Sequence, residues 1–153
     1  MSDYLRNTRI CLFPQLAPAL VTALRAYGEQ QQLGDLAATA VRCCETISRK
    51  PKKGLFGKEE VIVTGVVLTP LWLVWAAGQP GQPPTVLSAR LGTFTVQDYG
   101  QKSPLQKLAP DTGVNVNGLL TDGVHPGTAF IGFGPEPAAA EFRAALSAAL
   151  AAP

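Results

Sequence analysis

The feature that most constrains this chain is a stretch without charge, since no side chain between Val61 and Ala89 is ionised at neutral pH. Such a stretch either crosses a bilayer or forms strands that are covered by protein on both faces. A spanning helix needs about 20 apolar residues, and the part ending at Ala77 is short and interrupted by Pro70. Basic residues before it and tryptophans near its end keep the membrane alternative open. The many valines and threonines favour strands.

Two of these strands are expected to form a hairpin, Val61 to Leu68 and Leu71 to Ala77, around Thr69-Pro70-Leu71. A sheet with one solvated face would carry polar residues at alternate positions, and the second strand does not. We therefore expect both of its faces to be covered, by the N-terminal helices or by a homodimer partner. One face comprises Leu71, Leu73, Trp75 and Ala77; the other comprises Trp72, Val74 and Ala76.

The N-terminal segment, residues 1–49, has a helical pattern from Pro14 onwards. Apolar residues recur at steps of three and four, which predicts two helices with a restart at Gly34 and an N-cap at Asp35. The stripe of the first helix is Leu16, Leu20, Leu24 and Tyr27. The stripe of the second is Leu33, Leu36, Ala37, Ala40, Val41, Cys44 and Ile47.

The C-terminal part is expected to add strands and one helix. A Gly/Pro-rich loop follows Ala77, and Gly92 separates two further strands. A last hairpin turns at Asp122-Gly123, with Asn117-Gly118 as a competing turn. The final helix opens at Pro135-Glu136-Pro137, where an acid suits the positive end of the helix dipole. The expected strands are Val86 to Leu91, Phe94 to Tyr99, Val114 to Leu120 and Thr128 to Phe133; the helix face is Phe142, Leu146 and Leu150.

The element order resembles the pleckstrin-homology-like (PH-like) superfamily, particularly its bacterial PH and GRAM-type branches. The likeness covers about residues 59–150 and is carried by Val66-Val67-Leu68-Thr69 with Leu73-Val74-Trp75, by Leu91 to Val96, and by Phe130 to Phe133 leading into Glu141-Phe142. It implies an α+β fold in which an antiparallel sheet or partly open barrel ends in a helix. We expect N-terminal helices (1–49) that pack on the same domain, a basic linker (50–58) and a PH-like β domain with its helix (59–153). The resemblance does not imply phosphoinositide binding, because the first turn reads Thr69-Pro70-Leu71-Trp72 where that family often has basic residues.

Positive charge is concentrated in the basic linker. Five of the thirteen basic residues lie within residues 49–58, at and just before this linker, and with Phe56 they are the candidate binding site for an anionic surface. At about 1 kcal/mol per cation the attraction to an anionic membrane is weak. A solvated linker is the simpler interpretation, and nucleic-acid contact would be non-specific. The five cations are Arg49, Lys50, Lys52, Lys53 and Lys58.

No catalytic constellation is visible. The single histidine, His125, is expected in a turn, and Cys11, Cys43 and Cys44 lack metal-ligand spacing. An odd cysteine number fits reduced thiols in a cytosol, where buried apolar cysteines are commoner than a vicinal disulfide or a soft-metal site. Gly132-Phe133-Gly134 lacks the rest of a dinucleotide fingerprint. We expect no enzyme, no cofactor and no metal.

The leading functional expectation is a non-enzymatic PH-like adaptor or scaffold that binds a protein partner or a second copy of itself. PH-like domains can bind peptides along an open strand edge without needing charge. Peripheral attachment to an anionic membrane through the basic linker is the alternative, and a small-ligand pocket near Trp72 or Trp75 is a third. We expect a cytoplasmic protein, at the membrane periphery in the second case, because the first residues lack the order of a signal peptide.

Overall fold

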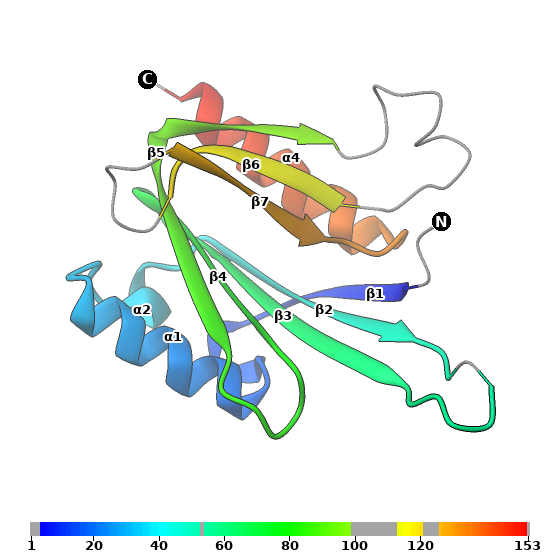
Figure 1. The fold of residues 1–153 in the computed structure, drawn as a ribbon. Coiled ribbons are helices and arrows are strands. Elements are labelled where there is room, and N and C mark those ends of the chain that lie inside the picture. Colours follow the sequence, from blue (N-terminus) through cyan, green and yellow to red (C-terminus); the bar gives the residue numbers. More distant parts are fainter. Residues whose placement is uncertain (1–3, 53, 99–112, 121–125, 153) are drawn as a thin grey trace.

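The computed structural model describes residues 4–52, 54–98, 113–120 and 126–152. Within these residues the chain is α+β: seven antiparallel strands form one sheet in sequence order, and the sheet is not closed. Helices lie on two sides of it (Figure 1). The elements are β1 (Leu5–Cys11), a 3-10 turn η1 (Phe13–Gln15), α1 (Pro18–Gln30), α2 (Leu36–Thr39), β2 (Arg42–Lys50), β3 (Glu60–Leu68), β4 (Trp72–Gly78), β5 (Thr85–Asp98), β6 (Gly113–Leu120), β7 (Pro126–Gly132) and α4 (Pro137–Ala151).

The sheet folds over on itself along β5. The first half of β5 pairs with β4 and the second half with β6, with a register shift between Ala89 and Phe94. Gly92 lies within this irregularity at φ +94, a conformation that favours glycine. One bent strand therefore replaces the two strands that were expected on either side of Gly92. It leads from the β1–β4 layer into the β6–β7 layer (Figure 1).

Both faces of β4 are buried, as its composition predicts. Val74 and Ala76 belong to a core layer shared with α1, and Leu73 and Trp75 belong to a second layer shared with α4. These four residues expose at most 4% of their surface. The described residues include no helix that is long and apolar enough to cross a membrane. The interpretation of this stretch as strands shielded on both sides is confirmed.

The first expected helix is present as α1, with Pro18 at its first turn, where a missing N–H costs nothing. Leu20 and Leu24 are buried against the sheet. A Cβ on Gly65 of β3 would lie 3.1 Å from a methyl of Leu20, so this glycine lets the helix approach closely. The Tyr27 hydroxyl lies 2.8 Å from the Ser88 hydroxyl on β5, which fastens the far end of α1.

The prediction of a second long helix is wrong. Only the short α2 forms there, capped as expected by Asp35, whose carboxylate accepts from the Ala38 N–H at 3.2 Å. The last two residues of the stripe, Cys44 and Ile47, belong to β2, which pairs with β3 and with β1, a strand that the helical interpretation missed. Because β2 is central and buried on both faces, its apolar residues do not alternate with polar ones, and the pattern imitates a helix.

The basic segment is a hairpin connection rather than a linker between a helix and the sheet. It joins β2 to β3, whose residues pair as far as Lys50 opposite Glu60. The expected turn before Trp72 is confirmed, with the Thr69 N–H donating to the Trp72 carbonyl at 2.9 Å. Asn117 and Gly118 lie inside β6 and form no turn. The alternative turn, Asp122-Gly123, lies outside the described residues.

The expected C-terminal helix is present as α4, and it covers the second face of β4, where the N-terminal helices or a homodimer partner were expected. Phe142 and Leu146 are buried, and the Phe142 ring lies 5.9 Å from that of Phe133. Glu136 is the N-cap residue, but its side chain makes no bond to α4. It accepts instead from the Thr8 N–H of β1 at 2.9 Å. The acid at this helix start therefore joins α4 to an edge strand.

The two edge strands, β1 and β7, are linked by side chains rather than by a hydrogen-bonded ladder. The Gly134 N–H, just after β7, donates to the Thr8 hydroxyl at 2.8 Å. The Arg6 guanidinium lies over the Phe130 ring at 5.4 Å. We call this contact between β1 and the end of β7 the seam. It holds the two layers together where the sheet remains open.

If both core layers are needed for stability, then truncating one leucine in each layer should destabilise the protein to a similar extent. We expect Leu24→Ala in the α1 layer and Leu146→Ala in the α4 layer each to lower the free energy of unfolding by about 2–5 kcal/mol. Urea unfolding measures this, with the exposed Leu55→Ala as the control that leaves stability unchanged. A negligible effect of Leu24→Ala on the free energy of unfolding would mean that the packing of α1 on the sheet does not stabilise the fold.

Candidate functional site

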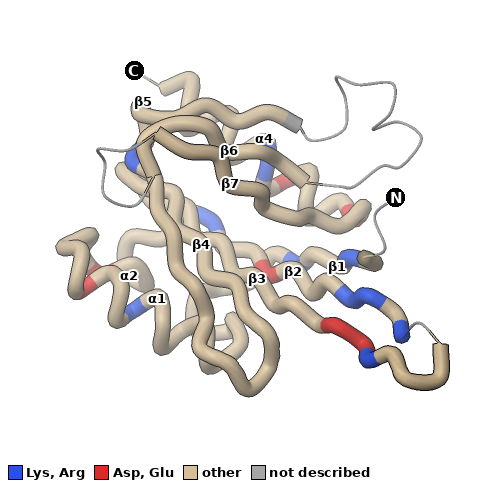
Figure 2. Tube along the Cα trace, in the orientation of Figure 1, with Lys and Arg blue, Asp and Glu red and all other residues tan. Residues whose placement is uncertain are grey.

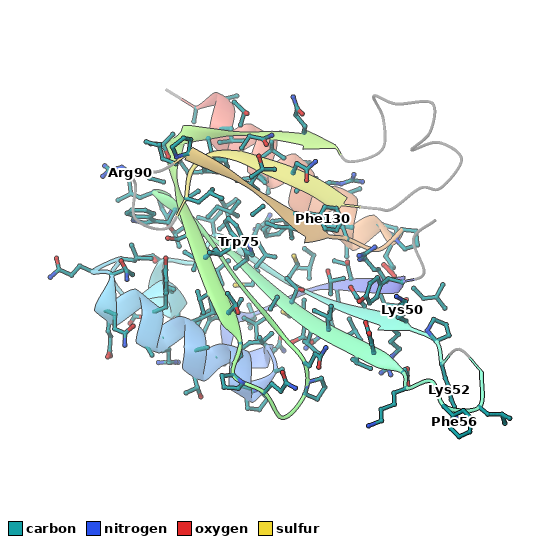
Figure 3. All side chains as sticks on the ribbon, viewed as in Figure 1. Lys50, Lys52, Phe56, Trp75, Arg90 and Phe130 are labelled. Atoms are coloured by element: carbon teal, nitrogen blue, oxygen red, sulfur yellow. The ribbon has the colours of Figure 1, made fainter. Side chains whose placement is uncertain are left out.

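The β2–β3 hairpin carries the residues that the distribution of charge in the sequence indicates as candidates for binding an anionic surface. Arg49 and Lys50 end β2, and Lys52, Phe56 and Lys58 follow in the connection to β3, whereas Lys53 lies outside the described residues. The hairpin projects beyond the helices (Figure 1), with Lys52 and Phe56 at its far end (Figure 3). Figure 2 shows positive and negative charge together along this hairpin.

The tip of the hairpin exposes two large apolar side chains. Phe56 is 98% exposed and Leu55 is 87% exposed. Gly54 precedes them at φ +70, which lets the chain turn. Lys52 and Lys58 flank them and are also exposed. Apolar side chains presented in this way next to lysines are typical of surfaces that meet another surface.

Carboxylates neutralise the base of the hairpin. Arg49 and Glu59 form an ion pair at 3.2 Å, and the Tyr4 hydroxyl donates to Glu60 at 2.9 Å. That hydrogen bond, with burial and the charge of Glu60, raises the pKa of the Tyr4 hydroxyl. The Lys50 ammonium lies 5.9 Å from the centre of the Tyr4 ring. Cationic character is therefore retained mainly towards the tip.

Glu45 is a buried carboxylate that the sequence did not single out. It lies on β2, is 6% exposed and pairs with Arg9 of β1 at 3.0 Å. Its other oxygen accepts from the Ala17 N–H at 2.7 Å, immediately before α1. The negative charge therefore sits at the positive end of the α1 dipole. Recognising residues 42–50 as a strand would have indicated that Glu45 points inward, towards α1.

The three cysteines are buried and free. Cys11 and Cys43 belong to the α1 layer, whereas Cys44 belongs to the α4 layer. Burial raises the pKa of the Cys43 thiol to about 12 and also raises the pKa values of Cys11 and Cys44. These thiols are therefore protonated at neutral pH and poor nucleophiles.

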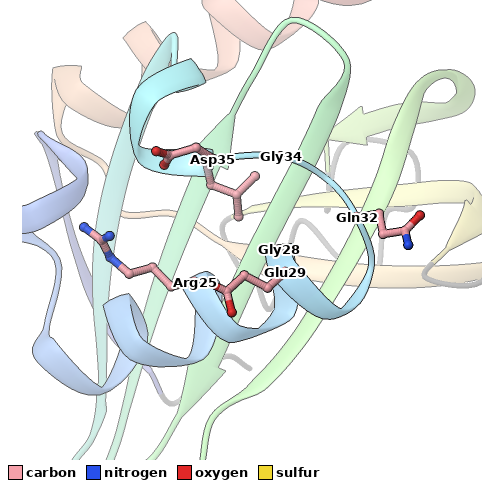
Figure 4. A pocket seen from close by; sticks show the side chains of 7 residues that line it. Arg25, Gly28, Glu29, Gln32, Gly34 and Asp35 are labelled. Carbon is pink, nitrogen blue, oxygen red and sulfur yellow. The ribbon is translucent and has the colours of Figure 1, made fainter.

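Among the cavities that the described residues form, two open at the surface near α1 and α2. One of about 450 Å³ lies between α1 and α2, with the charged residues Arg25, Glu29 and Asp35 at its wall (Figure 4). A second, of about 570 Å³, is lined by Cys11 and Cys43 among others. Neither contains Trp72 or Trp75, around which a ligand pocket was expected.

The two tryptophans pack into the protein. Trp75 is 4% exposed within the α4 layer, and Trp72 packs partly buried against the α1 layer. His125 lies outside the described residues. Among the described residues, no three histidine, cysteine, aspartate or glutamate side chains gather closely enough to hold a metal ion.

Comparison with known proteins gives no relative. No family model matches this chain, and no curated protein or solved structure is significantly similar to it. The resemblance to PH-like domains therefore stays a prediction.

Glu45 should stabilise the protein far more than a surface carboxylate does. We expect Glu45→Ala to lower the free energy of unfolding by about 2–4 kcal/mol, because it leaves the Ala17 N–H without its acceptor and Arg9 without its carboxylate partner. Glu141→Ala is the matched control, since Glu141 is 58% exposed and pairs with Arg42 at 3.9 Å. That change should cost less than about 1 kcal/mol. Equal losses in urea unfolding would contradict a special role for Glu45.

Proposed function

We propose that the protein attaches reversibly to anionic membrane surfaces through the tip of the β2–β3 hairpin. The observation that supports this best is the combination of two almost fully exposed apolar side chains, Leu55 and Phe56, with exposed Lys52 and Lys58 at one projecting end. Apolar side chains can enter the headgroup region while lysines remain at the level of the phosphates. We place the protein in the cytoplasm and its sheet in the PH-like class as part of this proposal.

The expected affinity is modest. Lys52 and Lys58, the tip lysines among the described residues, contribute about 1 kcal/mol each near an anionic leaflet. Full burial of a leucine or phenylalanine side chain contributes about 1.5–3 kcal/mol. Ordering of the tip and incomplete burial offset part of this sum. Binding should therefore be reversible and sensitive to salt, and a second contact would be needed for permanent anchoring.

Binding of a protein partner, the first functional expectation, has less support from the geometry. A peptide that adds to β1 needs free backbone donors along that edge. The Thr8 N–H in the middle of β1 is already bonded to Glu136. The hairpin tip offers apolar surface and charge without this obstruction, and its charge complements lipid phosphates.

Vesicle sedimentation tests the proposal. The full chain should bind vesicles that contain phosphatidylserine and should not bind vesicles of phosphatidylcholine alone. Lys52→Gln with Lys58→Gln should weaken binding about 30-fold, corresponding to about 2 kcal/mol. Phe56→Ser should weaken it at least about tenfold through lost apolar burial. High salt should weaken binding of the unaltered chain.

Matched controls separate the tip from general charge and hydrophobicity. Arg25→Gln with Arg90→Gln removes the same charge elsewhere, and Leu71→Ser removes an exposed apolar side chain (56%) from another turn. Both should bind as the unaltered chain does. Equal binding by the Lys52/Lys58 variant would refute the electrostatic mechanism. If the chain does not bind vesicles but captures a protein in stoichiometric amount through Phe56, then the proposal of membrane attachment is wrong and the tip is a protein-binding site.

A further inference from the structure

Cys11 and Cys43 lie directly opposite one another on β1 and β2. They are 8% and 3% exposed and share the α1 layer, so their side chains project from the same face of the sheet. Both line the cavity of about 570 Å³, which also has exposed Leu12 and Val41 in its wall. Small solutes can therefore reach the thiol pair from the surface. The sequence alone, in which the two residues are far apart, gives no sign of this pairing.

The hydrogen-bond pattern of β1 sets the spacing of the two cysteines. The Thr8 N–H points away from β2, because it donates to Glu136. Thr8 and Thr46 are therefore a non-hydrogen-bonded pair, and their hydroxyl oxygens lie 2.7 Å apart. The type of pair alternates along an antiparallel ladder, so Cys11 and Cys43, three pairs further on, are a hydrogen-bonded pair.

This spacing favours a bridging metal ion over a disulfide. The Cβ atoms of hydrogen-bonded pairs lie at the wide end of about 4.5–5.5 Å. A disulfide needs Cβ atoms about 3.5–4.5 Å apart. A metal ion with metal–sulfur bonds of about 2.3 Å spans sulfurs up to about 4.6 Å apart when it binds them in a line. The spacing typical of a hydrogen-bonded pair therefore suits an ion bound between two sulfurs better than a disulfide.

We propose that Cys11 and Cys43 form a two-thiolate binding site for a soft monovalent metal ion of low coordination number, of which Cu(I) is the representative. Soft thiolates select such ions, whereas a structural zinc site needs four ligands and the described residues gather no such set here. Binding displaces both thiol protons, so one Cu(I) and two thiols give one complex of charge −1 and two released protons.

The surroundings can accommodate that negative charge. Arg42 lines the same cavity, and the positive charge of Arg9, which is paired with Glu45, partly opposes the burial that raises the pKa of Cys11. Glu141 also lines the cavity, and its ion pair with Arg42 neutralises it in part. Because the thiols are protonated at neutral pH, apparent metal affinity should rise with pH as proton competition falls. The site is independent of the hairpin tip, so its test does not depend on membrane attachment.

Anaerobic titration with Cu(I) against a chromophoric Cu(I) chelator tests the site. The reduced full chain should bind one Cu(I), and X-ray absorption should show coordination by two sulfur atoms. Cys11→Ser and Cys43→Ser should each reduce the affinity more than about 100-fold, since even loss of a residue that supports a metal ligand costs about 10–100-fold. Bound Cu(I) should also raise the melting temperature and protect Cys11 from alkylation.

Cys44→Ala is the matched control, because Cys44 lies next to Cys43 in the sequence but in the other core layer. This variant should keep the Cu(I) affinity. If Cys44→Ala does not fold, Cys44→Val, which refills the volume, replaces it. Equal Cu(I) affinity in the Cys11→Ser variant would overturn the proposal. So would loss of two mass units per chain on exposure to oxidised glutathione with Cys11 and Cys43 joined, because the pair would then be close enough for a disulfide.

Discussion

The burial of β4 on both faces is the constraint on which the rest of this structure depends. A strand without charge cannot leave either face in water, and the protein meets this requirement with two different covers. Val74 and Ala76 face the α1 layer, whereas Leu73 and Trp75 face the layer closed by α4 and by the folded-over half of the sheet. The bend in β5 near Gly92 provides the second cover, because it directs β6 and β7 back across β1–β4.

Because α1 is inserted in the sequence between two neighbouring strands, a buried charged group lies where the α1 layer meets the sheet. Because η1, α1 and α2 lie between β1 and β2 in the sequence, the chain must leave the sheet and return to it beside the strand that it left. Glu45 meets the chain at this point, where it bonds both to Arg9 of β1 and to the start of α1. The single buried carboxylate of Glu45 thus links β1, the start of α1 and β2, the strand on which it lies.

Much of the fold was predictable, and the largest failure has one physical origin. The β3–β4 hairpin, α1, α4 and the capping of α2 by Asp35 follow from local pattern and turn chemistry. Residues 42–50 were mistaken for a helix because a strand buried on both faces loses its two-residue period. That error also hid the inward position of Glu45 and the pairing of Cys11 with Cys43, which depend on register. The exposed tip at Phe56 was predictable from composition, although its projection from a hairpin was not.

The seam has a consequence for the behaviour of the protein at high concentration. Open sheets present rows of unsatisfied backbone groups on which foreign strands can assemble into fibres. Here the two outermost strands approach one another, and the Thr8 amide on one of them is occupied by a carboxylate of the same molecule. At this position the backbone donor of the edge strand is bonded within the molecule and is not available to a foreign strand.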